Sequence, residues 1–169
     1  TFYGAAFIPP GTGVILNNEM DDFAIKPGVA NGFDLVGGTA NAIAPGKRML
    51  SSMAPTFLES PRGVAVLGTP GGSRIISMVL LASLAWIDGA DATTMAALRR
   101  YHHQFQPDVV GHEAGAFTTA EAEALRARGH VLQASPRPYG NLQVVTWDRA
   151  TGAVAAASDP RGGGDTVVY

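Results

Sequence analysis

Residues 63–87 read GVAVLGTPGGSRIISMVLLASLAWI, a strand, a glycine turn and a helix in immediate succession. The short apolar run Gly63–Gly68 predicts a buried strand. The helix predicted over Ser73–Ile87 is apolar nearly all round, so we expect it to be deeply buried. A buried strand that runs directly into a buried helix indicates a layered domain in which helices pack on a sheet.

The segments on either side extend this pattern. The sequence Thr118-Thr-Ala-Glu121 predicts a capping box for a helix that ends at Gly129. Further elements are expected as a buried strand at Gly13–Leu16, an irregular loop from Lys26 to Gly38, a helix at Ala92–Arg100, a strand at Val131–Ala134, and a hairpin of Leu142–Trp147 with Ala153–Ala157. We therefore expect one α+β domain over residues 1–169, with a mostly antiparallel sheet.

Composition excludes several classes of protein. The chain has 169 residues, of which 46% are hydrophobic and 15% charged, so disorder is not expected. A net charge of -2 without a long basic cluster argues against nucleic-acid binding. The longest apolar run, within Ile75–Ile87, is too short to span a membrane. The chain contains no cysteine, which is compatible with either redox compartment.

An acidic cluster follows the first predicted strand. Residues 17–23 read NNEMDDF, with Glu19, Asp21 and Asp22 close together. Clustered carboxylates repel one another unless a cation lies among them. A solvated acidic turn, a site for a substrate ammonium group and a calcium site are all compatible with this pattern, although the spacing of a calcium loop is absent.

Two serines, Ser51 and Ser52, follow a basic pair in KRMLSSM. They could form a turn or a helix cap, or hold a carboxylate with their hydroxyls. Neither serine lies in a Gly-x-Ser-x-Gly elbow, and the four histidines lack the spacing of a metal-binding helix. Nucleophilic serine catalysis and a metal site built on the histidines are therefore poorly supported.

Gly71 and Gly72 precede the predicted buried helix. The stretch is not a P-loop, because no Gly-Lys-Ser/Thr follows at the required spacing. Amide N–H groups at a helix N-terminus, with no Cβ in the way, suit an oxyanion hole. A plain tight turn with a helix cap explains the same residues.

Six stretches in this order resemble the γ-glutamyltranspeptidase family of N-terminal-nucleophile hydrolases. They are GTGVILNNEMDDF, KPGVANGFDLVGG, NAIAPGKRMLSSMAPT, GTPGGSRI, RYHHQFQPD and ASDPR, and they cover almost the whole chain. The resemblance implies the small-subunit half of a four-layer αββα sandwich, completed by a large subunit from the same precursor. It implies no metal and no cofactor.

The resemblance also assigns roles to residues. Asp22, assisted by Glu19, matches the aspartate that binds the α-ammonium of the γ-glutamyl group. The serine pair Ser51 and Ser52 matches the one that holds the α-carboxylate, together with an arginine from the large subunit. The glycines that match those of the oxyanion hole are Gly71 and Gly72.

Pro27–Gly38 matches the lid loop over the pocket, which we take as residues 26–38. Phe33 stands where better-studied bacterial relatives carry tyrosine, so it retains the ring and loses the hydroxyl. If these assignments hold, Asp22, the serine pair and the two glycines surround one glutamate-sized pocket.

The family's nucleophile is a threonine at the start of the small subunit, whose own amine acts as base. Alignment of the acidic motif places Thr1 after that nucleophile. We therefore expect that the nucleophile and its strand are absent from this chain, and that the chain alone is inactive. The alternative is that Thr1 is the nucleophile of a shortened relative.

The activity implied is transfer or hydrolysis of γ-glutamyl groups from glutathione and similar amides through a γ-glutamyl-threonine intermediate. Alternatives are a cephalosporin acylase, a poly-γ-glutamate-processing relative, or an inactive remnant. By resemblance, the expected location is periplasmic or secreted.

Overall fold

A computed structural model describes residues 4–169, and the chain divides into two compact units. Unit 1 covers residues 1–52 and unit 2 covers residues 53–169. Thr1, on which the prediction about the missing nucleophile falls, lies outside the described residues.

Unit 2 contains two sheets. Its elements are β1 (Thr56–Ser60), β2 (Gly63–Gly68), α1 (Arg74–Ile87), α2 (Ala92–Ala97), β3 (Tyr101–His102), β4 (Val110–His112), α3 (Thr119–Ala127), β5 (Leu132–Ala134), β6 (Gln143–Asp148) and β7 (Val154–Ser158). The larger sheet has the order β1-β2-β6-β7 and is antiparallel throughout. The predicted buried strand, the hairpin and the mostly antiparallel sheet are confirmed, whereas β1 was not expected.

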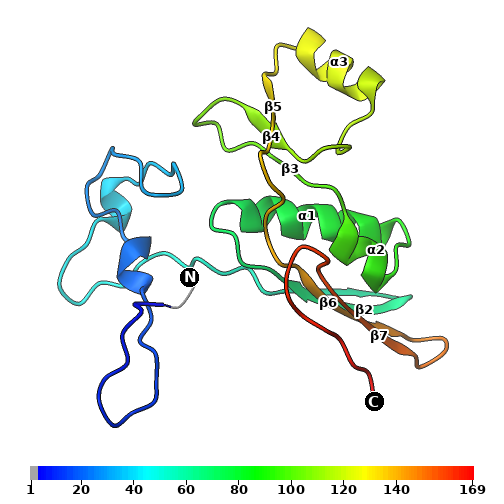
Figure 1. The fold of residues 1–169 in the computed structure, drawn as a ribbon, viewed down its shortest axis with the longest axis horizontal. Coiled ribbons are helices and arrows are strands. Elements are labelled where there is room, and N and C mark those ends of the chain that lie inside the picture. Colours follow the sequence, from blue (N-terminus) through cyan, green and yellow to red (C-terminus); the bar gives the residue numbers. More distant parts are fainter. Residues whose placement is uncertain (1–3) are drawn as a thin grey trace. The chain divides into compact units, whose positions relative to one another are not determined.

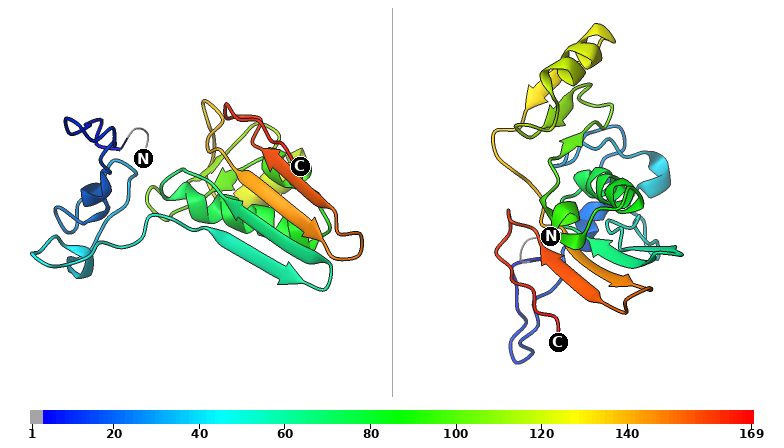
Figure 2. Two further views of the ribbon diagram at one scale, coloured as in Figure 1. Left: turned by 90° about the horizontal axis from the view of Figure 1, so that it is seen from below. Right: turned by 90° about the vertical axis from the view of Figure 1, so that its right-hand side faces the viewer.

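The helices α1 and α2 cover one face of the larger sheet (Figures 1 and 2). Alternation along β2 directs Ala65 and Leu67 toward these helices, because successive strand residues point to opposite faces. They pack with Ala82, Trp86 and Met95 in the hydrophobic core. This core holds the strand end and the helix start on either side of the glycine turn.

The expectation that α1 is buried all round is wrong. Ile76, Leu80, Leu84 and Ile87 are exposed, with Ile76 at 72%. Their spacing places them along one side of the helix, while Met78, Ala82 and Trp86 on the other side are buried. Within unit 2 the larger sheet covers only one face of the helix.

The smaller sheet has the order β3-β4-β5, and β4 pairs with β5 in parallel. The predicted capping box is present, since Thr118 Oγ1 accepts from the Glu121 N–H at 3.2 Å and Glu121 Oε2 accepts from the Thr118 N–H at 2.7 Å. The bonds that the Thr118 N–H and hydroxyl donate to the Glu121 carboxylate lower its pKa. The helix that they begin is α3.

A buried ion-pair network links α2, β4 and β7. Arg100, Glu113 and Asp159 are each at most 4% exposed, and Arg161 binds Glu113 at 2.7 Å and Asp159 at 3.1 Å. The helix predicted at Ala92–Arg100 therefore ends early, at Ala97, because Arg100 leaves it to pair with Asp159 and to accept the Glu113 N–H.

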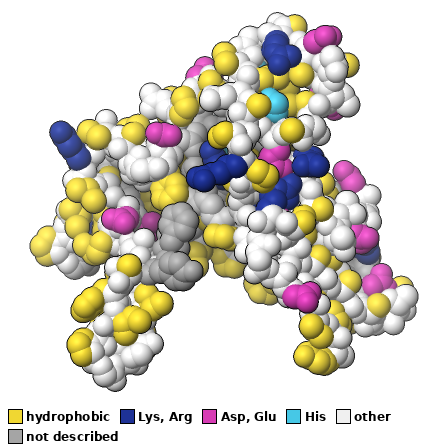
Figure 3. Space-filling view, in the orientation of Figure 1, with side chains coloured by type: hydrophobic (Ala, Val, Ile, Leu, Met, Phe, Trp, Pro, Cys, Tyr) yellow, Lys and Arg dark blue, Asp and Glu magenta, His cyan; other side chains and the backbone are white. Residues whose placement is uncertain are grey.

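Unit 1 is mostly irregular and contains two short 3-10 helices, η1 (Glu19–Asp22) and η2 (Thr39–Asn41). Phe23 is the one buried residue among residues 4–52, and hydrophobic side chains lie on the surface (Figure 3). The prediction of a buried strand at Gly13–Leu16 is wrong, since these residues are exposed and irregular. Leu16 exchanges backbone hydrogen bonds with Ala5 and Phe7 at 2.8 and 3.0 Å, but no sheet among residues 4–52 covers the segment.

Candidate functional site

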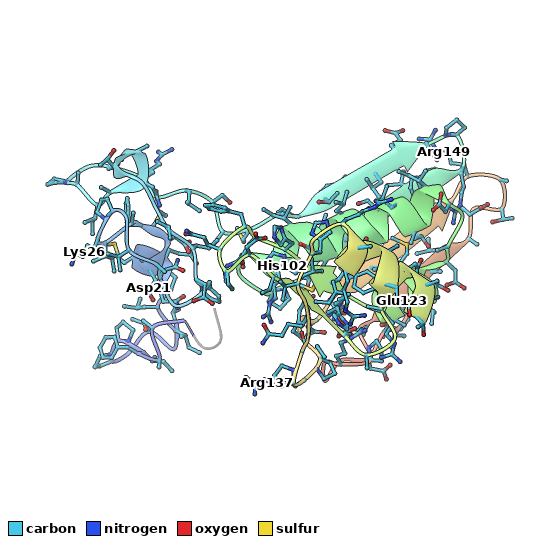
Figure 4. The ribbon with its side chains drawn as sticks, turned by 90° about the horizontal axis from the view of Figure 1, so that it is seen from above. Asp21, Lys26, His102, Glu123, Arg137 and Arg149 are labelled. Carbon is cyan, nitrogen blue, oxygen red and sulfur yellow. The ribbon has the colours of Figure 1, made fainter. Side chains whose placement is uncertain are left out.

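The acidic cluster forms η1, and the side chain of Asn17 binds the backbone at the start of this helix. The side-chain Oδ1 of Asn17 accepts from the Glu19 N–H at 3.0 Å, and Phe23 at the other end is buried at 6% exposure. Figure 4 labels Asp21, which is exposed on this helix. Asp22 instead lies partly buried beside Phe23. The two adjacent aspartates therefore lie in different environments, with Asp21 exposed and Asp22 partly buried.

The Oδ2 atom of Asp22 is buried and has no hydrogen-bond partner within residues 4–169. A buried carboxylate oxygen that lacks a donor is unfavourable, and a cation or an N–H donor removes the penalty. The arrangement suits a ligand that brings a positive charge. No group of three or more His, Asp or Glu residues in the described part of the chain could hold a metal ion.

The serine pair lies at the end of unit 1, near η1. Ser52 Oγ donates to Glu19 Oε2 at 3.4 Å, and Ser51 is exposed. The structure thus brings a hydroxyl of the pair to the acidic turn, although 33 positions separate Ser52 and Glu19 in sequence. This unit combines an anionic oxygen that needs a donor with hydroxyls that can donate.

Asn41, which the sequence analysis did not single out, joins these segments. Its Nδ2 donates to the Asp22 carbonyl oxygen at 2.7 Å, and its Oδ1 accepts from the Leu50 N–H at 3.0 Å. Its own carbonyl accepts from the Ala24 N–H at 2.9 Å. Asparagine often bonds to loop backbone in this way, which is the signal that could have identified it.

Residues 26–38, which contain the predicted lid, form an arm that closes on itself. The Gly28 N–H donates to the Gly37 carbonyl at 2.9 Å. At the tip, Asn31 Oδ1 accepts from the N–H groups of Phe33 and Leu35 at 2.9 and 3.1 Å. Phe33 is 43% exposed. Lys26, at the base of the arm, is labelled in Figure 4.

Gly71 and Gly72 lie in unit 2, between β2 and α1, and both have positive φ, at 150° and 58°. Their carbonyls accept from the N–H groups of Arg74 and Ile75 at 3.2 and 3.1 Å. Within the described residues their own N–H groups donate no hydrogen bond. Ser73 makes no side-chain capping bond, so the positive end of α1 and two free amides remain available to an anion.

The glycine turn is fixed from two sides. Thr69 Oγ1 donates to the Pro70 carbonyl at 2.9 Å and accepts from the Asn141 N–H at 3.2 Å. Met78, which is 2% exposed, lies beneath Gly71, where a Cβ would come within 2.7 Å of the methionine Cε. The turn can therefore present its amides without rearrangement, as transition-state stabilisation requires.

His102 links the smaller sheet to α1 (Figure 4). Its Nδ1 lies 2.6 Å from Ser77 Oγ and its Nε2 lies 2.8 Å from Gln104 Oε1. Burial lowers its pKa, so the ring is neutral at neutral pH. Because the Gln104 oxygen can only accept, Nε2 carries the proton and Nδ1 accepts from Ser77.

A family model described as gamma-glutamyltranspeptidase matches residues 1–169. The glutathione hydrolase proenzyme of Pseudomonas aeruginosa is 42% identical over 166 residues, which are 96% of this chain and 29% of that protein. The chain therefore spans about three-tenths of the length of this curated relative. No helix among residues 4–169 is long and apolar enough to cross a membrane.

Solved structures of γ-glutamyltranspeptidases also match this chain. A γ-glutamyltranspeptidase T380A mutant from Helicobacter pylori has a TM-score of 0.85 at 38% identity, over 95% of this chain and 88% of that one. The enzyme from Pseudomonas nitroreducens in complex with L-DON has a TM-score of 0.83 at 41% identity, over 99% and 88%. The protein is therefore of mixed α/β architecture and belongs to the γ-glutamyltranspeptidase family.

Proposed function

We propose that this chain supplies the donor-binding and oxyanion-stabilising groups of an enzyme that transfers γ-glutamyl groups from glutathione and similar amides to water or an amino acid. The buried, unpartnered Asp22 oxygen is the observation that carries the proposal. An α-ammonium group would supply both the charge and the donors that this oxygen lacks.

In this reaction Asp22 and Glu19 receive the α-ammonium group, while Ser51 and Ser52 donate to the α-carboxylate. A zwitterionic head group requires both kinds of partner. Fixing it in place orients the γ-carbonyl and removes part of the entropic barrier to attack. By family resemblance, an arginine of the large subunit also binds the carboxylate.

The family chemistry then proceeds through an acyl-enzyme. A threonine hydroxyl, placed by alignment before Thr1, attacks the γ-carbonyl and forms an ester as the amide C–N bond breaks. The departing amine takes up a proton. The N–H groups of Gly71 and Gly72 stabilise the tetrahedral oxyanion, and water or an amino acid then releases the γ-glutamyl group.

We also propose that the larger sheet stacks against a sheet of the large subunit in a four-layer αββα sandwich. The strand register aligns Phe57, Val66, Val145 and Ala156 in a row across the four strands. On the face opposite the helices, Phe57 is 74% exposed and Trp147 is 45% exposed. An apolar sheet face normally packs against a second layer.

The test is turnover of a γ-glutamyl anilide by the full-length protein, with Asp22→Asn as the variant and Asp21→Asn as its matched control. We expect Asp22→Asn to lower kcat/KM by about 10- to 100-fold, because a hydrogen bond to a charged group contributes about 1.5–3 kcal/mol. The exposed neighbour should tolerate the same change. Equal losses in the two variants, or no turnover by the unaltered protein, would contradict the proposal.

A periplasmic or secreted location is proposed from the family resemblance alone. Fractionation of the native host with an antibody to this chain tests it. Recovery of the protein with cytoplasmic markers would show the proposal to be wrong.

A further inference from the structure

The polar groups that unit 1 offers to a ligand come from two separate stretches. Asp22 ends η1, and Ser52 lies well beyond it in the chain, after η2 and a stretch without helix or strand. Hydrogen bonds within a single helix or sheet therefore do not fix the distance between them. Some other contact must set that spacing if both stretches are to hold one small molecule.

Asn41 makes that contact with a single amide group. Its Nδ2 donates to the carbonyl of Asp22, and its Oδ1 accepts from the N–H of Leu50. Leu50 immediately precedes the serine pair. The carboxamide thus bridges the backbone of the aspartate and the backbone that leads to the serines, and it does so beside the longer bond from Ser52 Oγ to Glu19 Oε2.

The bridge itself is held in place. The Asn41 N–H donates to the Gly38 carbonyl at 3.2 Å, and the Asn41 carbonyl accepts from the Ala24 N–H. Ala24 also approaches Gly37 so closely that a Cβ on the glycine would come within 2.6 Å of the alanine Cβ. With its backbone anchored, the side chain has little freedom to swing away from its two partners.

We propose that Asn41 is a positioning residue, which sets the distance between the ammonium-binding and carboxylate-binding halves of the donor site. The inference rests on the proposed function. Asparagine is suited to the role because one end of its carboxamide donates and the other accepts. Aspartate at this position keeps the acceptor for Leu50 and loses the donor for Asp22, while leucine loses both.

The experiment is calorimetric titration of the full-length protein with L-glutamate, glutarate and 4-aminobutyrate. Glutarate lacks the ammonium group, and 4-aminobutyrate lacks the α-carboxylate. For Asn41→Asp we expect the Kd of L-glutamate and of 4-aminobutyrate to rise at least 10-fold, while the Kd of glutarate is unchanged. For Asn41→Leu the Kd of all three should rise.

Thr12→Val is the control, since it also removes side-chain bonds to backbone in unit 1, to Pro9 and Val14, and should change no Kd. A similar rise for glutarate and glutamate in Asn41→Asp would indicate general loss of structure and overturn the inference, as would no change. If thermal melting shows that Asn41→Leu is unfolded, Asn41→Asp alone decides.

Turnover of the γ-glutamyl anilide by the unaltered protein separates the two proposals. Turnover with unchanged binding in Asn41→Asp would refute the positioning role and leave the proposed function intact. Glutamate binding with the expected ligand pattern but no turnover would refute the function and retain the role. No glutamate binding by the unaltered protein would refute the positioning role.

Discussion

At the scale of single residues, Gly71 is constrained twice. Its φ of 150° is outside the range that other residues favour, and a Cβ there would come within 2.7 Å of Met78 Cε. Met78 is buried at 2% exposure, so its Cε atom would have to shift to admit the Cβ. Glycine at this position is therefore favoured by the backbone conformation, and the contact with Met78 adds to the cost of any side chain.

Gly71→Ala should lower kcat for a γ-glutamyl anilide by about 100-fold or more, because displacement of one oxyanion donor typically costs that much. Steady-state kinetics of the full-length protein measure this loss. Gly115→Ala is the control, since Gly115 also has positive φ but a Cβ there meets nothing within 4 Å. Comparable kcat values for the two variants would contradict an oxyanion role for the turn.

At the scale of elements, the buried network connects motifs that lie far apart in sequence. Arg161 forms a bidentate pair with Glu113 through Nε and Nη2, both at 2.7 Å, and Asp159 binds Arg100 and accepts the Leu142 N–H. These bonds tie the ends of α2, β4 and β7 together. Removal of the Arg161 charge leaves Glu113 buried without an ion-pair partner in the described residues, while Asp159 retains Arg100.

Arg161→Met should therefore lower the free energy of unfolding by about 3–5 kcal/mol, which is typical for breaking a buried ion pair. Urea denaturation measures the change. Arg149→Met is the matched control, because Arg149 pairs with Glu59 on the surface, where such pairs contribute about 0–1 kcal/mol. A loss at Arg161 no larger than that at Arg149 would show that the network adds little.

The same network predicts a dependence on pH. Burial raises the pKa of Asp159, but hydrogen bonds from the Arg161 N–H, Arg100 and the Leu142 N–H outweigh it, and the pKa lies below its ordinary value. A lowered folded-state pKa stabilises the protein above the unfolded pKa of about 4, and the contribution is lost as the pH falls through the folded value. The free energy of unfolding of Asp159→Asn should depend less on pH below about 4 than that of the unaltered protein. Parallel curves of the free energy of unfolding against pH would contradict this.

Most elements whose cover lies within unit 2 could be predicted from sequence. The strand β2 and the hairpin of β6 and β7 follow from apolar runs and turn residues, and Thr118 with Glu121 identifies the start of α3. Prediction failed at Gly13–Leu16 and on the outer face of α1. An apolar pattern indicates that a segment is suited to burial, but it does not identify the element that packs against it. Asn41 escaped notice because a loop asparagine carries no periodic signal.

At the scale of the whole molecule, the chain exposes many large hydrophobic side chains, and monomeric soluble proteins rarely expose large apolar patches. Of its two tryptophans, Trp86 is 5% exposed and Trp147 is 45% exposed on the outer sheet face. Trp147 therefore reports on whether another layer covers that face. The proposed sandwich predicts a buried environment for Trp147 in the full-length protein.

A Trp86→Phe variant isolates this signal. In the 169-residue chain expressed alone, Trp147 fluorescence should have its maximum at the wavelength of solvated indole. In the full-length protein the maximum should shift to shorter wavelength, after substitution of any tryptophan outside this chain. An unshifted maximum would argue against a sheet stacked on this face.

The closed arm at residues 26–38 has a consequence for how the family can diversify. Its base is closed by the hydrogen bond from the Gly28 N–H to the Gly37 carbonyl. Its tip is closed separately, by the bonds from the Phe33 and Leu35 N–H groups to the Asn31 side chain. Side chains exposed at the tip, such as Phe33 at 43% exposure, can thus be exchanged without touching the contacts of Asn41 or η1. Exchange of exposed side chains at the tip would therefore leave the bond between Gly28 and Gly37 in place.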